Sequence, residues 1–317
     1  MRSISDQRGQ TIVMTVVFLT VLLGMSASVL DVGSWYRADR HAQATADAAA
    51  LAGAQGLRAS QGAAAARALE YAGKNGGGLA PTAITFPAAD EVAVRIERPA
   101  PGFFSRLFGI ESVTVSATAT ARAAAMTDAR WAAPIVVSWF NEYMPGGGDP
   151  ACVPDPCFGP SRETTLELVD LHSPGSGNAA GAFGLLDLRL GGNGAVGSSE
   201  LADWMEVGFS GLMKSKVKYE SIPSVMFNSN EFKTALDTRF ESGKEILLPV
   251  YDDLRRSGST AEYNIVGWVG FKITSWKAQG NGGQVTGYFT EVFWDGVQVG
   301  PGDPNAAFGA LTIKLVD

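Results

Sequence analysis

An uncharged apolar stretch near the N-terminus constrains this chain more than any other feature. It occupies residues 12–30 and reads IVMTVVFLTVLLGMSASVL. At about 1.5 Å per helical residue it reaches roughly 28 Å, close to the thickness of the hydrocarbon core of a bilayer. Each of its Val, Leu, Ile and Phe side chains favours insertion by roughly 0.3 to 0.6 kcal/mol at the centre of a span. The stretch is therefore predicted to cross a membrane once, as a helix.

The flanking charges predict the orientation of this helix. Arg2 and Arg8 precede the stretch with only Asp6 of opposite sign, whereas acidic and basic residues balance in the segment that follows it. Because basic flanks stay on the cytoplasmic side, we expect a cytoplasmic N-terminus and an extracytoplasmic bulk of the chain. A cleaved secretory signal with its cleavage site at residues 26–28 is the alternative.

The helical pattern continues well past the apolar stretch. No proline occurs between residues 32 and 57, and alanine dominates there. One helix over residues 11–56, near 70 Å long, is the simplest interpretation. This continuity favours an uncleaved anchor, because a signal peptidase needs extended chain at its site.

Small residues recur at helical spacing along the predicted helix. The small-residue stripe comprises Thr20, Gly24 and Ser28 inside the apolar stretch and continues through Ala42 and Ala49. Small side chains allow a partner helix, or the protein's own sheet, to approach closely. Alanine used simply as a good helix former explains the pattern equally well.

Two aromatic residues, Trp35 and Tyr36, follow the apolar stretch by about one helical turn. Amphipathic rings at that position favour the lipid headgroup layer. Packing in the protein core is the alternative for both rings.

Overall charge and the two cysteines fit an envelope protein. The formal net charge is −7, and no basic patch interleaved with aromatic residues occurs, so nucleic-acid binding is excluded. Cys152 and Cys157 lie in a Pro-containing segment, ACVPDPCFG. Outside the cytosol such a close pair is predicted to form a disulfide. A zinc site is disfavoured, because zinc needs four ligands and the nearest histidine is His172.

Composition divides the chain into three segments. Residues 1–57 hold the leader, the transmembrane helix and its Ala-rich extension, and residues 128–317 are predicted to form a strand-rich, β-sandwich-like extracytoplasmic domain. Between them, residues 58–127 are predicted to form a small α+β unit. Its expected elements are a helix at 62–71, strands at 83–86, 91–97 and 112–121, and a helical turn at 103–109. The fold class is therefore α+β.

Alternating apolar residues predict the strands of the third segment. The candidate strands are 133–139, 164–171, 183–188, 246–250, 263–276, 285–294 and 311–316, with helices at 199–207 and 228–240.

Short motifs around the apolar stretch carry a family resemblance. RGQT at 8–11 precedes the stretch, LDVG at 30–33 ends it, and DAAALAGA follows at 47–54. This region resembles the N-terminal part of the Flp pilus-assembly TadG-like family. The resemblance implies a membrane helix leading into an envelope domain, with partners among the proteins of the Tad secretion machinery that builds Flp pili.

The chain departs from patterns found in proteins related to this family. A prepilin-peptidase site has a Gly followed five residues later by Glu, whereas Gly9 is followed at that distance by Met14. The Asp-x-Ser-x-Ser metal motif of the von Willebrand A domains in longer members does not occur either. Neither this processing nor a metal role is carried over.

Patterns that suggest an enzyme are weak. A literal G-x-G-x-x-G occupies residues 192–197, but no partner strand of a βαβ unit follows it. The two histidines, His41 and His172, have no accompanying G-x-S-x-G. We therefore expect a non-enzymatic protein with no catalytic residues, cofactor or metal.

Aromatic residues in the C-terminal strands offer an alternative function, that of a secreted or anchored adhesin with a ligand-binding aromatic surface. Packing of these rings in the core is the favoured interpretation. The residues concerned are Trp268, Phe271, Trp276, Tyr288, Phe289, Phe293 and Trp294. The favoured function is a membrane-anchored component associated with Tad/Flp pilus assembly, which contacts other assembly proteins through its helix.

Overall fold

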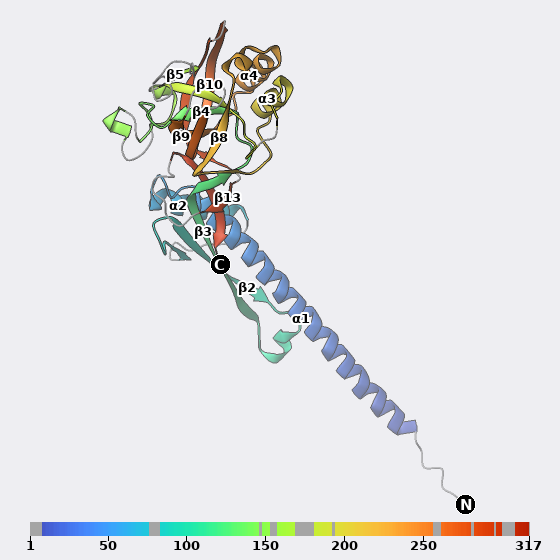
Figure 1. Ribbon diagram of the computed structural model, residues 1–317. Coiled ribbons are helices and arrows are strands. Elements are labelled where there is room, and N and C mark those ends of the chain that lie inside the picture. Colours follow the sequence, from blue (N-terminus) through green and yellow to red (C-terminus); the bar gives the residue numbers. More distant parts are fainter. Residues whose placement is uncertain are drawn as a thin grey trace, which may run out of the picture. The chain divides into compact units, whose positions relative to one another are not determined.

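The computed structural model describes residues 8–75, 83–145, 148–152, 157–168, 181–191, 194–255, 261–279, 282–294, 296–299 and 308–316. Contacts group the chain into two compact units (Figure 1). Unit 1 comprises Met1–Ala123 and Ile313–Asp317, and unit 2 comprises Ala124–Thr312. The predicted α+β class with a long N-terminal helix and a strand-rich part is confirmed.

Unit 1 is built around one long helix, α1 (Arg8–Ala54). The helix predicted for residues 11–56 is thus confirmed, and it is continuous because neither proline nor a turn signal interrupts it. The other elements of the unit are helix α2 (Gln61–Lys74), strands β1 (Ile84–Thr85), β2 (Glu91–Pro101) and β3 (Ser112–Ala129), and the 3₁₀ turn η2 (Ser105–Phe108). Strand β3 continues beyond the unit boundary at Ala123.

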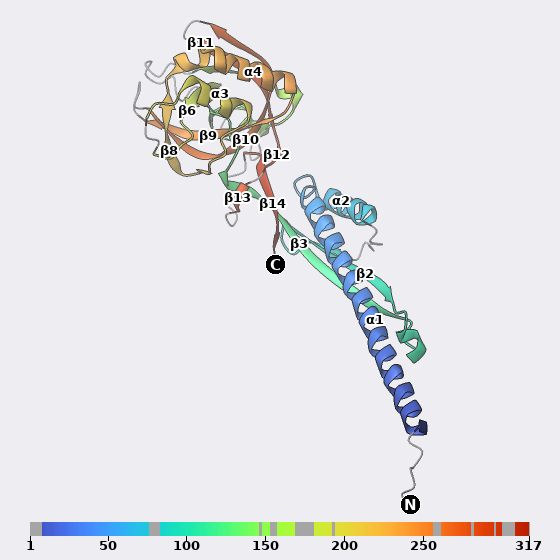
Figure 2. The same cartoon turned by 90° about the vertical axis from the view of Figure 1, so that its right-hand side faces the viewer.

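Helix α2 and the β2–β3 hairpin pack along the C-terminal half of α1 (Figure 2). The hydroxyl of Ser60 caps α2 by accepting the N–H of Ala63 at 3.0 Å. Strand β2 buries alternate residues and pairs with β3 in antiparallel register, with Val94 opposite Ala119. The buried cluster is rich in alanine, so the backbones approach closely. Its fully buried members include Ala42, Ala46, Ala49, Ala50, Ala68, Ala72, Val92, Val94 and Ile96.

Gly56, between α1 and α2, lies at a very close approach between its own backbone and that of α2. A Cβ added there would lie 2.7 Å from the backbone of Ala64, whereas one added at Gly73 in α2 would meet nothing within 4 Å. We expect Gly56→Ala to destabilise the packing of α2 by about 1–3 kcal/mol through overpacking. The matched change Gly73→Ala should be neutral or stabilising by up to roughly 1 kcal/mol, because alanine is the better helix former.

Hydrogen exchange of the α2 amides in detergent-solubilised protein measures this difference. Equal protection of α2 in the two variants would contradict the close packing of α2 on α1.

Unit 2 is organised by one mixed sheet of seven strands in the order β11-β5-β6-β4-β9-β10-β8. The strands are β4 (Ile135–Ser138), β5 (Thr164–Leu168), β6 (Ala182–Leu186), β8 (Val217–Ile222), β9 (Ile246–Arg255), β10 (Glu262–Gln279) and β11 (Gly282–Thr290). Strand β11 also pairs with β10, and β6 also pairs with β8, so the pairings close into a ring. The domain predicted to be β-sandwich-like is thus built on a sheet that closes upon itself. A closed sheet has no open edges.

Bulges in β10 allow this closure. The register of β10 shifts near Ile265 against β9 and near Ile273 against β11. A bulge bends its strand and increases the local twist, so one long strand can pair with β9 and β8 at one end and with β11 at the other.

Two helices accompany the sheet of unit 2. Helices α3 (Ser198–Glu206) and α4 (Asn230–Ser242) contact each other, and α4 also contacts β10. The hydroxyl of Ser229 caps α4 by accepting the N–H of Phe232, and Gly243 ends it in the left-handed region at φ 61°. The remaining short elements are β7 (Met213–Lys214), β12 (Val292–Phe293), β13 (Gly296–Val299), β14 (Ala310–Val316), η3 (Pro150–Cys152), η4 (Pro160–Arg162) and η6 (Ser224–Asn228).

Candidate membrane anchor and its contacts

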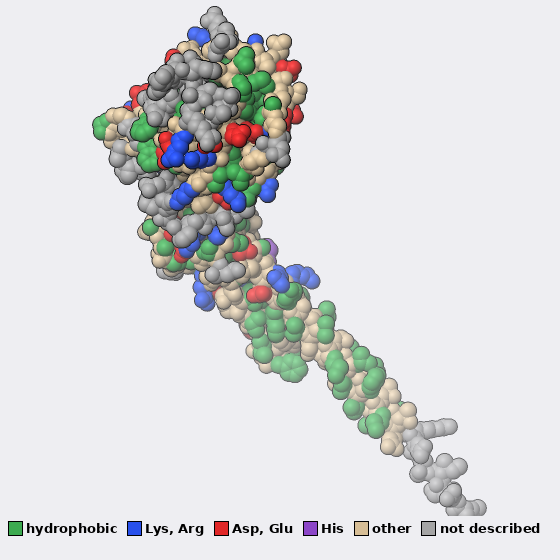
Figure 3. Space-filling model, viewed as in Figure 1, with side chains coloured by type: hydrophobic (Ala, Val, Ile, Leu, Met, Phe, Trp, Pro, Cys, Tyr) green, Lys and Arg blue, Asp and Glu red, His purple; other side chains and the backbone are tan. Residues whose placement is uncertain are grey.

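The N-terminal half of α1 carries a bare apolar surface. By length and composition, α1 can cross a membrane, and the other described residues bury none of its most apolar window. Apolar side chains cover this half of the helix and the neighbouring hairpin tip (Figure 3). Such a large exposed apolar surface is typical of a segment that is surrounded by lipid.

The structure gives the two halves of the small-residue stripe different environments. Ala42 and Ala49 are fully buried against the protein's own α2 and hairpin. Thr20 and Ser28 are exposed, and their hydroxyls donate to the carbonyls of the preceding turn at 2.8 and 3.1 Å. A Cβ added at Gly24 would meet nothing within 4 Å. The close approach predicted for the stripe is therefore intramolecular at its C-terminal end, and at Gly24 no described residue makes such an approach.

The two aromatic residues after the span also differ in environment. Trp35 is half-buried, and its indole nitrogen is buried without a hydrogen-bond partner among the residues described. Tyr36 is exposed, and its hydroxyl accepts a hydrogen bond of 2.9 Å from Nε of Arg40. Tyr36 thus presents a polar end beside a cation, the arrangement that suits a headgroup layer.

Asp31 joins α1 to the hairpin tip, a contact that was not predicted from the sequence. Its side chain is almost fully buried, and its carboxylate accepts three consecutive backbone N–H groups. The donors are Phe103 at 2.7 Å, Phe104 at 3.1 Å and Ser105 at 2.6 Å. Burial by itself raises the pKa of Asp31, but the N–H donors of Phe103, Ser105 and Phe104 together lower it below the usual value. The carboxylate is therefore ionised at neutral pH and holds the tip against α1.

A second polar contact links α1 to the hairpin further along. The Arg98 guanidinium of β2 donates to Nδ1 of His41 on α1. His41 therefore has a structural partner, and His172 lies outside the described residues.

The sequence carried one local signal for the Asp31 contact, which is a lone carboxylate at the end of the apolar stretch.

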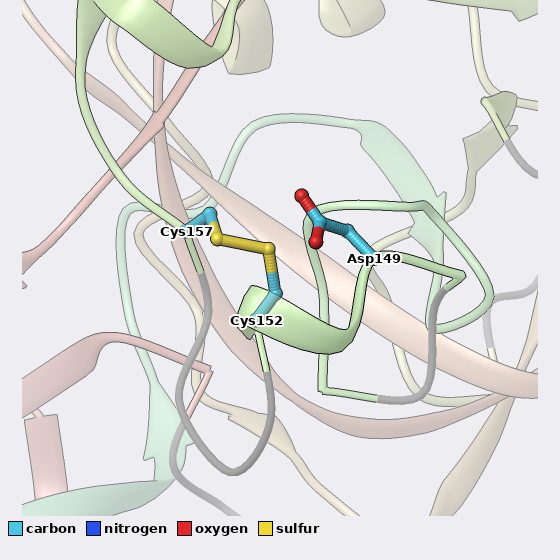
Figure 4. Close-up of side chains that lie close together, drawn as sticks. All are labelled: Asp149, Cys152 and Cys157. Atoms are coloured by element: carbon cyan, nitrogen blue, oxygen red, sulfur yellow. A yellow bond between two sulfur atoms is a disulfide. The ribbon is translucent and has the colours of Figure 1, made fainter.

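Cys152 and Cys157 form the predicted disulfide, with their Cα atoms 5.0 Å apart (Figure 4). Asp149 lies close to both sulfur atoms, but its carboxylate already accepts Nη1 of Arg162 and the N–H of Ala151, each at 2.8 Å. Sulfur atoms in a disulfide are not thiolate ligands, so this cluster is a structural cross-link and not a metal site.

The disulfide should protect both thiols in native, aerobically prepared protein. Alkylation without reduction is expected to label neither cysteine, and reduction should destabilise the loop by roughly 2 kcal/mol in the chain-entropy model. Mass spectrometry of the alkylated protein reads the outcome. Quantitative labelling before reduction would contradict both the bond and an oxidising location for unit 2.

The C-terminal aromatic residues mostly pack in the core and do not form one exposed platform. Trp268, Phe271 and Phe289 are buried, and the rings of the last two meet edge to face at 5.2 Å. Trp294 is half-buried and donates its indole N–H to the carbonyl of Arg130. Phe293 is exposed, while Trp276 and Tyr288 are half-buried. Trp268, Phe271 and Phe289 therefore contribute to the core of unit 2, which agrees with the favoured interpretation.

The glycine motif lies between β6 and α3, with Gly192 and Asn193 outside the described residues. The next strand that pairs with β6 after α3 is β8, and it runs antiparallel to β6. A dinucleotide-binding unit instead uses a parallel crossover. Asp252 and Asp253 lie within β9, where Asn264 donates to Asp252 and Arg255 pairs with Asp253.

A match to a protein family covers the candidate anchor. No curated protein and no solved structure matches the chain. The match spans the exposed apolar half of α1, Asp31 and the alanine-rich half that packs on α2. Residues 9–56 match the family described as Putative Flp pilus-assembly TadE/G-like, which confirms the resemblance predicted for this region.

Proposed function

We propose that the chain is a membrane-anchored, non-enzymatic component of Tad/Flp-type pilus assembly. The match of residues 9–56 to the TadE/G-like family is the observation that carries this proposal. The bare apolar half of α1 supports a single membrane span, and the basic leader supports a cytoplasmic N-terminus. Units 1 and 2 would then lie outside the cytoplasm, where the disulfide is stable.

The small-residue half of α1 supplies a surface for contact with other assembly proteins. Thr20, Gly24 and Ser28 share one helical face, and both hydroxyls are satisfied by the helix backbone. In a membrane, a face without bulky side chains or unpaired polar groups allows a second helix to pack closely. We therefore assign this face to helix–helix contact within the assembly machinery.

Three titratable groups described above have structural partners. His41 accepts a hydrogen bond from Arg98. Asp149 forms a salt bridge with Arg162, and Asp253 forms one with Arg255. These contacts support a structural role in preference to catalysis.

The mature protein should retain its leader and remain in the membrane. We expect alkaline carbonate to leave the chain in the membrane fraction, because a span of about 19 apolar residues is not removed by disrupting electrostatic contacts. Intact-mass analysis should find an N-terminus ahead of Arg8. Mature chains beginning near Gln10 would indicate prepilin processing and would contradict the retained leader. Chains beginning near Val29 would indicate signal-peptidase cleavage and would contradict the anchor itself.

A further inference from the structure

The tip of the β2–β3 hairpin exposes an unusual set of large apolar side chains. We define the apolar tip as Phe103, Phe104, Leu107, Phe108 and Ile110. Leu107 is 81% exposed and Phe108 is 84% exposed. Short hairpin connections in water are normally polar, so an apolar tip needs a nonpolar environment or a partner.

The position of the tip along α1 identifies that environment. Asp31, the first residue after the predicted span, binds the backbone of residues 103–105. Leu107 and Phe108 line a groove of about 850 Å³ together with Gly24 on α1. Gly24 precedes Leu30 by six residues, which corresponds to roughly 9 Å along the helix toward the membrane centre. The tip therefore lies beside residues that the proposed anchor places among acyl chains.

We propose that the apolar tip is a second membrane contact, inserted among the phospholipid acyl chains of the extracytoplasmic leaflet. This inference rests on the proposed anchor, because it takes the membrane position from α1. It commits to lipid as the partner of the tip because the exposed side chains of the tip are continuous with the apolar surface of the span.

Two polar features of the same region match the next layer of a bilayer. Arg37 lines an adjoining groove with Phe103 and Phe104, about two turns beyond the span, at the height of lipid phosphates. Trp35 lines the groove beside the tip, about one helical turn beyond the span. Tryptophan side chains favour the interfacial layer of a bilayer, which is the level that Trp35 would occupy.

The Asp31 contact fixes the depth at which the tip lies in the membrane. Three N–H groups on one carboxylate fix both the height and the rotation of η2 relative to α1. A loop held only by apolar contacts could slide along the helix. The tip and the span therefore enter the membrane as one unit and fix how far the protein stands from the bilayer.

Depth-dependent quenching in lipid vesicles tests the proposal. Three single-cysteine variants of the full chain, with the native cysteines disulfide-bonded, would carry an environment-sensitive fluorophore at the tip (Leu107→Cys), in the span (Val17→Cys) or on α2 (Leu69→Cys). Leu69 is a matched apolar control, because it is partly exposed in the same unit and α2 packs on the far end of α1. The vesicles would contain phosphatidylcholine and phosphatidylglycerol, with a nitroxide on the upper acyl chain.

We expect the labels at positions 107 and 17 to be quenched several-fold more strongly than the label at 69. The result should not change with the protein-to-lipid ratio. Quenching at 17 with none at 107 would overturn the tip contact while leaving the anchor intact. Absence of quenching at 17 would overturn the anchor and the tip contact together. Protection of 107 that appears only at high protein density would assign the tip to a second copy of the chain, and would overturn the lipid proposal.

Discussion

Replacing Gly24 by leucine should abolish pilus formation while leaving the protein in the membrane. Leucine is favourable within a span, so insertion is retained or improved. A Cβ at Gly24 has no neighbour within 4 Å in the protein's own structure, and the rest of the leucine side chain has the open groove beside the hairpin tip to occupy. It would, however, hold apart any helix packed against Thr20, Gly24 and Ser28. The expected loss therefore comes from the intermolecular contact and not from misfolding.

Thr15→Leu is the matched control for this substitution. Thr15 lies in the same exposed part of α1 and precedes Gly24 by nine residues, which places it on the opposite side of the helix. Membrane retention, cross-linking to other pilus-assembly proteins and pilus number would be measured for both variants. Normal cross-links and pili with Gly24→Leu would mean that the stripe is only helix-forming composition.

Substitution of Asp31 by asparagine should release the hairpin tip. The carboxylate accepts three N–H groups, whereas an amide presents one acceptor oxygen and adds N–H donors that face other donors. Hydrogen exchange of residues 103–105 should therefore accelerate about tenfold or more, because buried N–H groups lose charge-assisted partners. The β2–β3 pairing and the Arg98–His41 contact remain, so the change should be confined to the tip.

Asp39→Asn on the same helix is the control, since Asp39 is exposed. Unchanged exchange at the tip in Asp31→Asn would contradict the assigned contact.

The Asp31 contact also predicts a dependence on pH. Because the folded protein holds the pKa of Asp31 below its usual value, its contribution to stability is present above that usual value, about 3.9. The contribution disappears as the pH falls further, through the lowered pKa of the folded state. Tip protection, corrected for the intrinsic exchange rate, should therefore be the same at pH 7 and pH 5 and decrease only in stronger acid. Release of the tip between pH 7 and pH 5 would show that another group controls it.

Local periodicity predicted most of the elements, and long-range pairing accounts for the differences. The apolar run and the proline-free alanine segment were sufficient to predict α1, and alternation was sufficient for β2, where Val92, Val94 and Ile96 are buried. Strand β8 was missed because its residues 217–222 alternate only weakly, and pairing with β10 and β6 makes it a strand. The closed sheet could not be predicted, because the partner of each strand is not encoded in its own alternation.

The candidate site was predicted only where its signal was local. The open face at Gly24 and the cysteine pair could be identified from spacing alone. Asp31 could not, because its partners lie more than 70 residues away and are backbone N–H groups whose side chains carry no information about the contact. The role of the Asp31 carboxylate can be recognised only once the structure places the hairpin beside it.

Electron microscopy of a strain that lacks this gene tests the membrane-held role in pilus assembly most directly. The strain would be complemented either with the full chain or with residues 32–317 behind a cleavable signal peptide, and export of both proteins would be verified. We expect no pili in the deletion strain, restoration by the full chain, and no restoration by the released form, because the span holds the contact face in the membrane. Normal piliation without the gene, or full restoration by the released form, would contradict the proposed role.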